Sequence, residues 1–424
     1  MLKKATQRLC LVVTLVICLG VLFFFKYYNF LASSVSALMT LFGAPSTDFT
    51  LNLILPVGIS FYTFQTLSYA IDVYRGRIKT ERHFGYYALF VSFFPQLVAG
   101  PIERPENLLP QLRTKQYWNN ADAAAGLKRM LVGFFKKVVV ADLFAVYVNA
   151  VYNDVSNASA VSVILASVMF AVQIYCDFSG YTDIAIGCAR VMGIRLMQNF
   201  DVPYTARSIK EFWNRWHISL STWFRDYLYF PLGGSRCAKW KHLMNLMIVF
   251  LVSGLWHGAA WTFVIWGFLH GAYQVVGILT KNAREDLCKK LGINRETKAY
   301  HAWQTICTFV LVTFAWIFFR ANSMADLGIL MTKLFTAWGV PLTDVFAGMG
   351  IDLRGAAISV LSVIVLIFLD RLVKHDEVPE SDGSLKSTAA VDRGKAIVLT
   401  WAIAVAWLAL LAGDGASSFI YFQF

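Results

Sequence analysis

Two histidines in an otherwise apolar chain are the first candidates for chemistry. His217 stands in "RWHIS", inside a segment crowded with tryptophan and arginine, and His257 stands in "LWHG", inside a hydrophobic stretch. An ionisable side chain within a membrane is costly unless it faces a cavity or a partner, and imidazole accepts a proton near neutral pH. The alternative is a neutral imidazole that hydrogen-bonds across helices. We favour a function for His257, and a structural role for His270 in "FLHG".

The segment around His217 carries polar residues that suit a charged ligand. "EFWNRWHISLSTWFRDYLYFPLGG" alternates aromatic and charged residues with neither a helical nor a strand period. Aromatic rings suit the membrane interface and arginines suit anionic groups, so one interpretation is an anchor that lies on the leaflet. Pro231 and the two glycines break the segment, which favours a short re-entrant unit carrying His217 inward. The supporting and donor-binding candidates are Asn214, Arg215, Arg225, Asp226, Trp256 and His270.

Other polar residues in apolar stretches have simpler interpretations. Asp177 and Asp183 in "QIYCDFSGYTDIAIG" lack the glycine and the closing glutamate of a calcium loop, so we expect them to orient a site or to mark a helix break. Lys136 and Lys137 are expected to extend to the lipid headgroups. The seven cysteines are scattered without metal-ligand spacing, so we predict neither a metal site nor a bound cofactor.

Composition places the chain among membrane proteins with several spans. Its 424 residues are 57% hydrophobic and only 15% charged, and the net charge of +12 is spread over loops rather than gathered in one block. Nucleic acid is therefore an unsuitable partner, and membrane lipid is the expected surroundings. Nine apolar stretches are candidate spans, and the run 88 to 100 is too short and reads as re-entrant or interfacial. The nine lie near 9–25, 51–71, 127–150, 161–177, 243–256, 259–279, 303–319, 356–372 and 396–411.

Loop charges predict an orientation for these spans. Segments rich in lysine and arginine are expected in the cytoplasm, at 75–82, 201–241 and 281–298. Segments without either residue are expected outside, at 43–52, 152–160 and 412–418. Nine crossings then place the N-terminus inside and the C-terminus outside.

Several long motifs resemble the membrane-bound O-acyltransferases, and specifically their bacterial alginate O-acetylation branch. They include "NFDVPYTARSIKEFWNRWHISLSTWFRDYLYFPLGGSR", "GLWHGAAWTFVIWGFLHG", "PQLVAGPIERPENLLPQL" and the terminal "FIYFQF", so the similarity covers nearly the whole chain, with a motif core at about 173–273. The resemblance implies one integral-membrane domain over 1–424, an all-α polytopic bundle of tilted helices with re-entrant segments around a central tunnel. Family members begin with further apolar helices before "FKYYNF". This chain is therefore either a shortened member or one whose start is misplaced.

The resemblance also implies a reaction at the plasma membrane. Acyl transfer would run from a cytoplasmic thioester such as acetyl-CoA toward an extracytoplasmic polysaccharide, often with a separate SGNH or esterase-like partner that completes delivery. The family's two motif histidines correspond to His217 and His257. We expect His257 to be the general base, and His217 to hold the donor or to donate a hydrogen bond to the acyl oxygen. Arg215 or Arg225 would meet an anionic carrier at the cytoplasmic mouth.

Two alternative functions stay open at this point. The sister branch of the family moves D-alanyl groups onto teichoic acids and shares the same histidines. The motif "LSTWFRDYLYFPLGG" favours the acetylating branch. A transporter that relays protons through intramembrane histidines is a non-enzymatic alternative. Transporters of that kind show repeated halves, and the sequence contains no such repeat.

Overall fold

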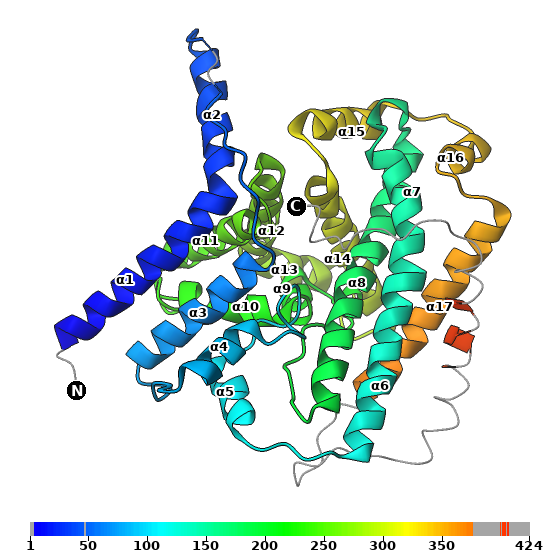
Figure 1. The fold of residues 1–424 in the computed structure, drawn as a ribbon. Coiled ribbons are helices and arrows are strands. Elements are labelled where there is room, and N and C mark those ends of the chain that lie inside the picture. Colours follow the sequence, from blue (N-terminus) through cyan, green and yellow to red (C-terminus); the bar gives the residue numbers. More distant parts are fainter. Residues whose placement is uncertain (1–3, 46–47, 376–398, 400, 404, 407–424) are drawn as a thin grey trace.

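The computed structural model describes residues 4–45, 48–375, 399, 401–403 and 405–406, which form helices and connecting loops without a strand (Figure 1). Within this part of the chain, five helices are long and apolar enough to cross a membrane. They are Lys4–Leu41, Ala160–Val191, Trp261–Leu279, Lys298–Arg320 and Leu353–Arg371. The all-α, polytopic class predicted from the sequence is thereby confirmed. The candidate span at 396–411 and the "FIYFQF" tail lie largely or wholly outside the described residues.

The first span is longer than its hydrophobic run at 9–25 suggested. Helix α1 (Lys4–Leu22) passes through a π-helical turn, η1 (Phe23–Tyr27), into α2 (Tyr28–Leu41) without a break. The next helix, α3 (Ile59–Tyr74), is shorter than the run at 51–71 predicted, because the preceding residues form an extended connection. Gly58 ends that connection with a φ of 75°, and a Cβ there would lie 2.6 Å from the carbonyl oxygen of Leu97.

The run at 88 to 100 is interrupted, as its length indicated. Helix α4 (Phe84–Ser92) stops at Phe93, and a turn-rich stretch leads to α5 (Pro105–Arg113). Ala99 and Ile102 in this stretch are buried by protein. Protein packing of that kind is what allows non-helical backbone at membrane depth.

Helices α6 and α8 pack together through glycines. Helix α6 (Asn120–Phe134) continues through η2 (Phe135–Ala141) into α7 (Asp142–Tyr152), which turns back through η3 (Val155–Asn157) into α8 (Ala160–Val191). A Cβ on Gly133 would lie 2.6 Å from the carbonyl oxygen of Gly180, and one on Gly187 would lie 2.5 Å from that of Gly126. Small residues at these four positions let the two backbones touch, which is how helices associate where no water drives them together.

The close approach of α6 and α8 encloses a buried ion network, which corrects two expectations. The Lys136 ammonium lies 2.8 Å from Asp183 Oδ2 and 2.7 Å from Asp370 Oδ1, and its side chain is 4% exposed. Lys137 lies 2.8 Å from both Asp177 and Asp142. Neither lysine therefore extends to the headgroups, because carboxylates within the bundle already hold both ammonium groups. Helix α8 is also unbroken, so the aspartates mark ion pairs and no helix break.

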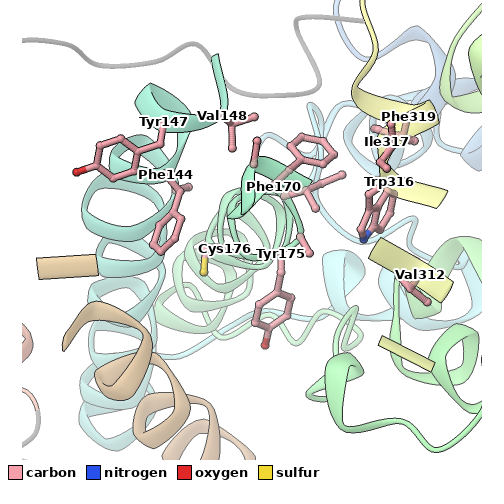
Figure 2. Close-up of a cluster of buried hydrophobic side chains, with 14 of the residues drawn as sticks. Phe144, Tyr147, Val148, Phe170, Tyr175, Cys176, Val312, Trp316, Ile317 and Phe319 are labelled. Carbon is pink, nitrogen blue, oxygen red and sulfur yellow. The ribbon is translucent and has the colours of Figure 1, made fainter. Parts of the chain in front are cut away.

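The second half of the chain carries the remaining helices and much of the core. They are η4 (Pro203–Thr205), α9 (Ile209–Arg215), α10 (Ile218–Phe224), η5 (Arg225–Tyr229), α11 (Lys239–His257), α12 (Trp261–Leu279), α13 (Lys281–Lys290), α14 (Lys298–Arg320), α15 (Met324–Thr336), α16 (Leu342–Gly348) and α17 (Leu353–His375). Figure 2 shows aromatic and aliphatic side chains of α7, α8 and α14, among them Phe144, Phe170 and Trp316, meeting in the main core.

Several of the segments that connect the helices lie at two opposite ends of the molecule. The turn between α7 and α8 lies at one end with α15 and α16, whereas the link from α5 to α6 and the C-terminal end of α8 lie at the opposite end (Figure 1). The α7–α8 turn belongs to the segments expected outside, and the chain after α8 enters the basic segment 201–241 expected in the cytoplasm. The orientation of the chain across the membrane stays a prediction from its loop charges.

Candidate active site

His217 is held in the protein interior by a break between two short helices. It lies between α9 and α10 with φ of 45° and ψ of 54°, and its side chain is fully buried. A residue other than glycine or asparagine adopts this left-handed conformation at an energetic cost, and such strain gathers at functional sites. The Ile218 amide donates to the carbonyl oxygen of Asn199 at 3.0 Å, which fixes the break against the chain after α8.

The side chain of Asn199 determines which nitrogen of His217 carries a proton. Asn199 Oδ1 accepts from the Ser219 amide at 3.2 Å and from the Ser219 hydroxyl at 2.8 Å, and it lies 3.1 Å from His217 Nδ1. A backbone amide can only donate, so this atom is the carbonyl oxygen of the side chain and Nδ1 is the protonated nitrogen. In the neutral ring, Nε2 then has a free lone pair. Nε2 is buried without a hydrogen-bond partner among the described residues.

His257 is the last residue of α11 and faces His217. The two ring centroids lie 6.2 Å apart, with Trp256 against both rings. The rings are too far apart to hydrogen-bond directly, yet close enough to contact one small substrate group between them. Trp266 and Phe319 pack on the far side of His257, with centroids 5.0 and 5.5 Å away. An aromatic wall thus surrounds the histidine pair.

Glycines allow α12 to fold back tightly beside the end of α11. A Cβ on Gly254 would lie 2.3 Å from the carbonyl oxygen of Phe263, and one on Gly267 would lie 2.4 Å from that of Phe250. A Cβ on Gly258, directly after His257, would overlap the Phe263 ring at 2.1 Å. The "LWHG" glycine is therefore required by space, and the tight hairpin fixes the position of His257.

Two pockets adjoin the segments that carry the histidines: His257 lines the smaller one, whereas the larger one reaches Ile218, next to His217, and is lined by neither histidine. One has a volume of about 540 Å³ and is lined by α9, α10, η5, α11 and α12, with Lys210, Asn214 and Arg225 among its polar residues and no acidic residue. The other has a volume of about 170 Å³ and is lined by the chain from Leu55 to Phe61 together with Lys26, Val98, Trp256 and His257. The larger pocket belongs to the basic segment, and the smaller one to the segment that follows the loop 43–52, which carries no lysine or arginine.

The other predicted residues separate into three groups. Asn214 and Arg225 line the larger pocket, and Trp256 packs against the rings of both histidines. Arg215 is occupied by Glu211 at 2.6 Å and by the Thr205 hydroxyl at 2.7 Å, and it lines neither pocket. Asp226 pairs with Arg225 at 2.8 Å and with Arg104 at 3.4 Å.

His270 occupies a structural position beside the site. Its Nδ1 accepts a hydrogen bond from Trp213 Nε1 at 3.2 Å, and its fully buried ring packs against Trp266 with centroids 5.0 Å apart. These contacts agree with the structural role favoured from the sequence.

Sequence reasoning missed residues that touch the histidines. Asn199 was passed over, because its contact with His217 depends on a left-handed turn that the sequence pattern does not indicate. Lys26 was also passed over. A lysine at the end of a long apolar run would have been flagged by the high cost of a charge within a membrane. Its partners, at the end of α11, are far away in the sequence and could not be read from the pattern.

Comparison with known proteins identifies the same family that the sequence motifs indicated. Residues 77–324 match the model of the membrane-bound O-acyltransferase family. The chain is 35% identical over 415 residues to a probable alginate O-acetylase of Pseudomonas putida, covering 96% of this chain and 82% of that protein. It is 38% identical over 347 residues to a peptidoglycan O-acetyltransferase of Helicobacter pylori, covering 76% of this chain and 63% of that protein. It is 30% identical over 231 residues to a teichoic acid D-alanyltransferase of Bacillus subtilis, covering 52% of this chain and 58% of that protein.

Proposed function

This chain belongs to the membrane-bound O-acyltransferase family, and we propose that it O-acetylates a polysaccharide on the outer side of the membrane. It is an O-acyltransferase and a multi-pass membrane protein. The observation that carries the proposal is the buried pair His217 and His257, with His257 on the wall of one pocket and a second pocket that reaches Ile218, the residue after His217. Identity is higher to O-acetylating relatives than to the D-alanyltransferase, which favours an acetyl group over D-alanine.

The larger pocket supports a thioester donor on an anionic carrier. Lys210 and Arg225 supply positive charge to its wall, Asn214 supplies an amide, and no acidic residue is among the lining residues, although Arg225 Nε also pairs with Asp226 at 2.8 Å. Arginine and lysine of this kind bind phosphate groups, which acetyl-CoA carries. The volume of about 540 Å³ is within the range of small-molecule sites. We therefore propose acetyl-CoA or a similar cytoplasmic thioester as donor, entering from the basic side.

The smaller pocket supports the approach of a hydroxyl from the other side. His257 forms part of its wall, so a hydroxyl entering there can approach this residue. We assign His257 as the general base: it takes the hydroxyl proton while the oxygen attacks the thioester carbonyl carbon. The C–S bond of the tetrahedral intermediate then breaks, and the proton leaves with the thiol.

The tautomer of His217 changes the role we expected for it. With Nδ1–H donating to Asn199, the neutral ring offers a lone pair at Nε2 and cannot donate a hydrogen bond to the acyl oxygen from that atom. We therefore propose that His217 is a second proton acceptor beside His257, able to share the proton during transfer. An extracytoplasmic esterase-like partner that carries the acetyl group to the polysaccharide completes the proposal.

The test is the acetyl content of extracted polysaccharide from a deletion strain that carries each variant at matched protein level. We expect His257→Ala and His217→Ala each to lose at least ~10²-fold, the lower range for a positioned proton acceptor. The double variant should be scarcely worse than either single one, because residues that act as one unit are not additive. His270→Ala is the control and should keep partial activity. Full acetylation by a stable His257→Ala protein would refute the mechanism, and an unchanged polysaccharide in the deletion strain would refute the acceptor class.

A further inference from the structure

The helix that ends at His257 finishes inside the protein, where its last carbonyl groups need partners. A helix leaves its final four carbonyl oxygens without intrahelical donors, and burying them unpaired is costly. In α11 the Gly254 carbonyl accepts from the Gly258 amide at 3.2 Å. The next three carbonyls, of Leu255, Trp256 and His257, receive their donors from a distant part of the chain.

Those donors are two consecutive residues of the first span. The Tyr27 hydroxyl donates to the carbonyl oxygen of Leu255 at 2.9 Å. The Lys26 ammonium donates to the carbonyl oxygen of Trp256 and lies 3.4 Å from that of His257. A cation at this end of a helix also interacts favourably with the helix dipole. Lys26 and Tyr27 together therefore cap the end of α11.

The backbone of the first span is adapted to this contact. Consecutive residues of an α-helix point about 100° apart, so two neighbours rarely reach the same target. Lys26 and Tyr27 lie in the π-helical turn η1, whose wider winding changes that spacing, and turns of this type are frequent at functional sites. Their two side chains reach successive carbonyls of one helix end, more than 200 residues away in the sequence.

The three protons of Lys26 all have acceptors. Besides the two carbonyls, the ammonium donates to the Ser60 hydroxyl at 3.2 Å, where the first span meets the start of α3. An ammonium group has three donors, so Lys26 has none left for a substrate without breaking one of these contacts. Its position on the wall of the smaller pocket therefore indicates that it holds the site together.

We propose that Lys26 and Tyr27 are positioning residues that set the place of His257 for acyl transfer. This inference rests on the proposed function. It also means that the site is completed from outside residues 77–324, the region that matches the family model. A shift of about 1 Å in a catalytic group can lower a rate about 100-fold, so loss of the cap should reduce turnover. Donor affinity should be preserved, because Lys26 and Tyr27 do not line the larger pocket.

Inside-out membrane vesicles supplied with ¹⁴C-acetyl-CoA test this inference. The measurement is acetyl incorporation into vesicle-bound acceptor at several donor concentrations, with each variant at matched protein level. We expect Lys26→Met to lower the maximal rate by about 10- to 100-fold, with the half-saturating donor concentration within about 2-fold of wild type. Lys26→Arg, which keeps a cation and several donors, should recover much of the rate. Tyr27→Phe, which removes one hydrogen bond, should have a smaller effect in the same direction.

Asn29→Ala, in α2 of the same continuous span, is the matched control. The Asn29 side chain donates to the carbonyl oxygen of Leu51 and accepts from the Leu51 amide, both at 2.9 Å, so the variant loosens the first span without touching α11. A control that loses as much rate as Lys26→Met, or a Lys26→Met protein with a wild-type rate, would overturn the inference. So would a loss of rate that appears only as weaker donor binding. A normal Lys26→Met protein beside an inactive His257→Ala protein refutes the inference alone, whereas wild-type vesicles that transfer nothing refute it together with the proposed function.

Discussion

Replacing Lys136 by methionine should destabilise the protein strongly, because the ammonium holds two carboxylates inside the helix bundle. Asp183 would keep Arg129, whose guanidinium lies 2.9 Å from Asp183 Oδ1. Asp370 would keep the Tyr175 hydroxyl at 2.7 Å but would lose the cation at 2.7 Å. Removing one partner of a buried ion pair typically costs about 3–5 kcal/mol, because an uncompensated charge remains. We expect a loss in this range, with Asp370 as its main source.

The assay is the free energy of unfolding of the purified protein, followed by helical signal as SDS is added to mixed micelles. Adding Asp370→Asn to Lys136→Met should recover part of the loss, because the remaining group is neutral and can still hydrogen-bond to Tyr175. Lys281→Met, on the exposed surface of α13, is the matched control and should change the free energy by no more than about 0.5 kcal/mol. If Lys136→Met behaves like that control, the lysine extends to the headgroups and the description of the network is wrong.

Three further predictions follow from the packing. Asn199→Ala should lower acetylation of the polysaccharide by at least about 10-fold, because His217 loses the acceptor that fixes its tautomer. Asn199→Asp keeps an acceptor and should retain more activity in the same assay. Gly180→Leu should reduce the yield of folded protein in detergent, because even a Cβ at this position would lie 2.8 Å from the carbonyl oxygen of Gly133 in α6. A normal yield of folded Gly180→Leu protein would contradict the close contact between these glycines. A membrane-impermeant maleimide added to intact cells should label Asn157→Cys but not Lys79→Cys, and the reverse pattern would invert the orientation.

The family and the helical class could be predicted because long motifs and hydrophobic runs are local features of the sequence. The sequence also singled out the histidines that the structure brings to 6.2 Å between ring centroids. Element ends were less accurate. The helix after the 43–52 loop begins only at Ile59, since Gly58 has a left-handed backbone conformation that composition does not reveal.

Residues whose role depends on distant partners could not be predicted. Lys136 was expected at the headgroups because its aspartates lie on α8 and α17, far along the chain. Asn199 depends on a left-handed turn at His217 that no periodicity indicates. In each case the role of a charged or amide side chain is determined by tertiary contacts, which the local sequence does not show.

Two of the π-helical turns, η1 and η2, have a consequence for how this chain tolerates changes of length. η1 carries Lys26 and η2 carries Lys136, and each of these two turns accommodates an extra residue within a longer helix. Deleting one residue from such a turn would leave a regular helix of ordinary stability. However, all side chains on one side of the deletion would rotate by about 100° and shift by about 1.5 Å relative to the other. Homologous sequences should therefore keep the number of residues in these turns even where residue types drift, and gaps in an alignment should fall elsewhere.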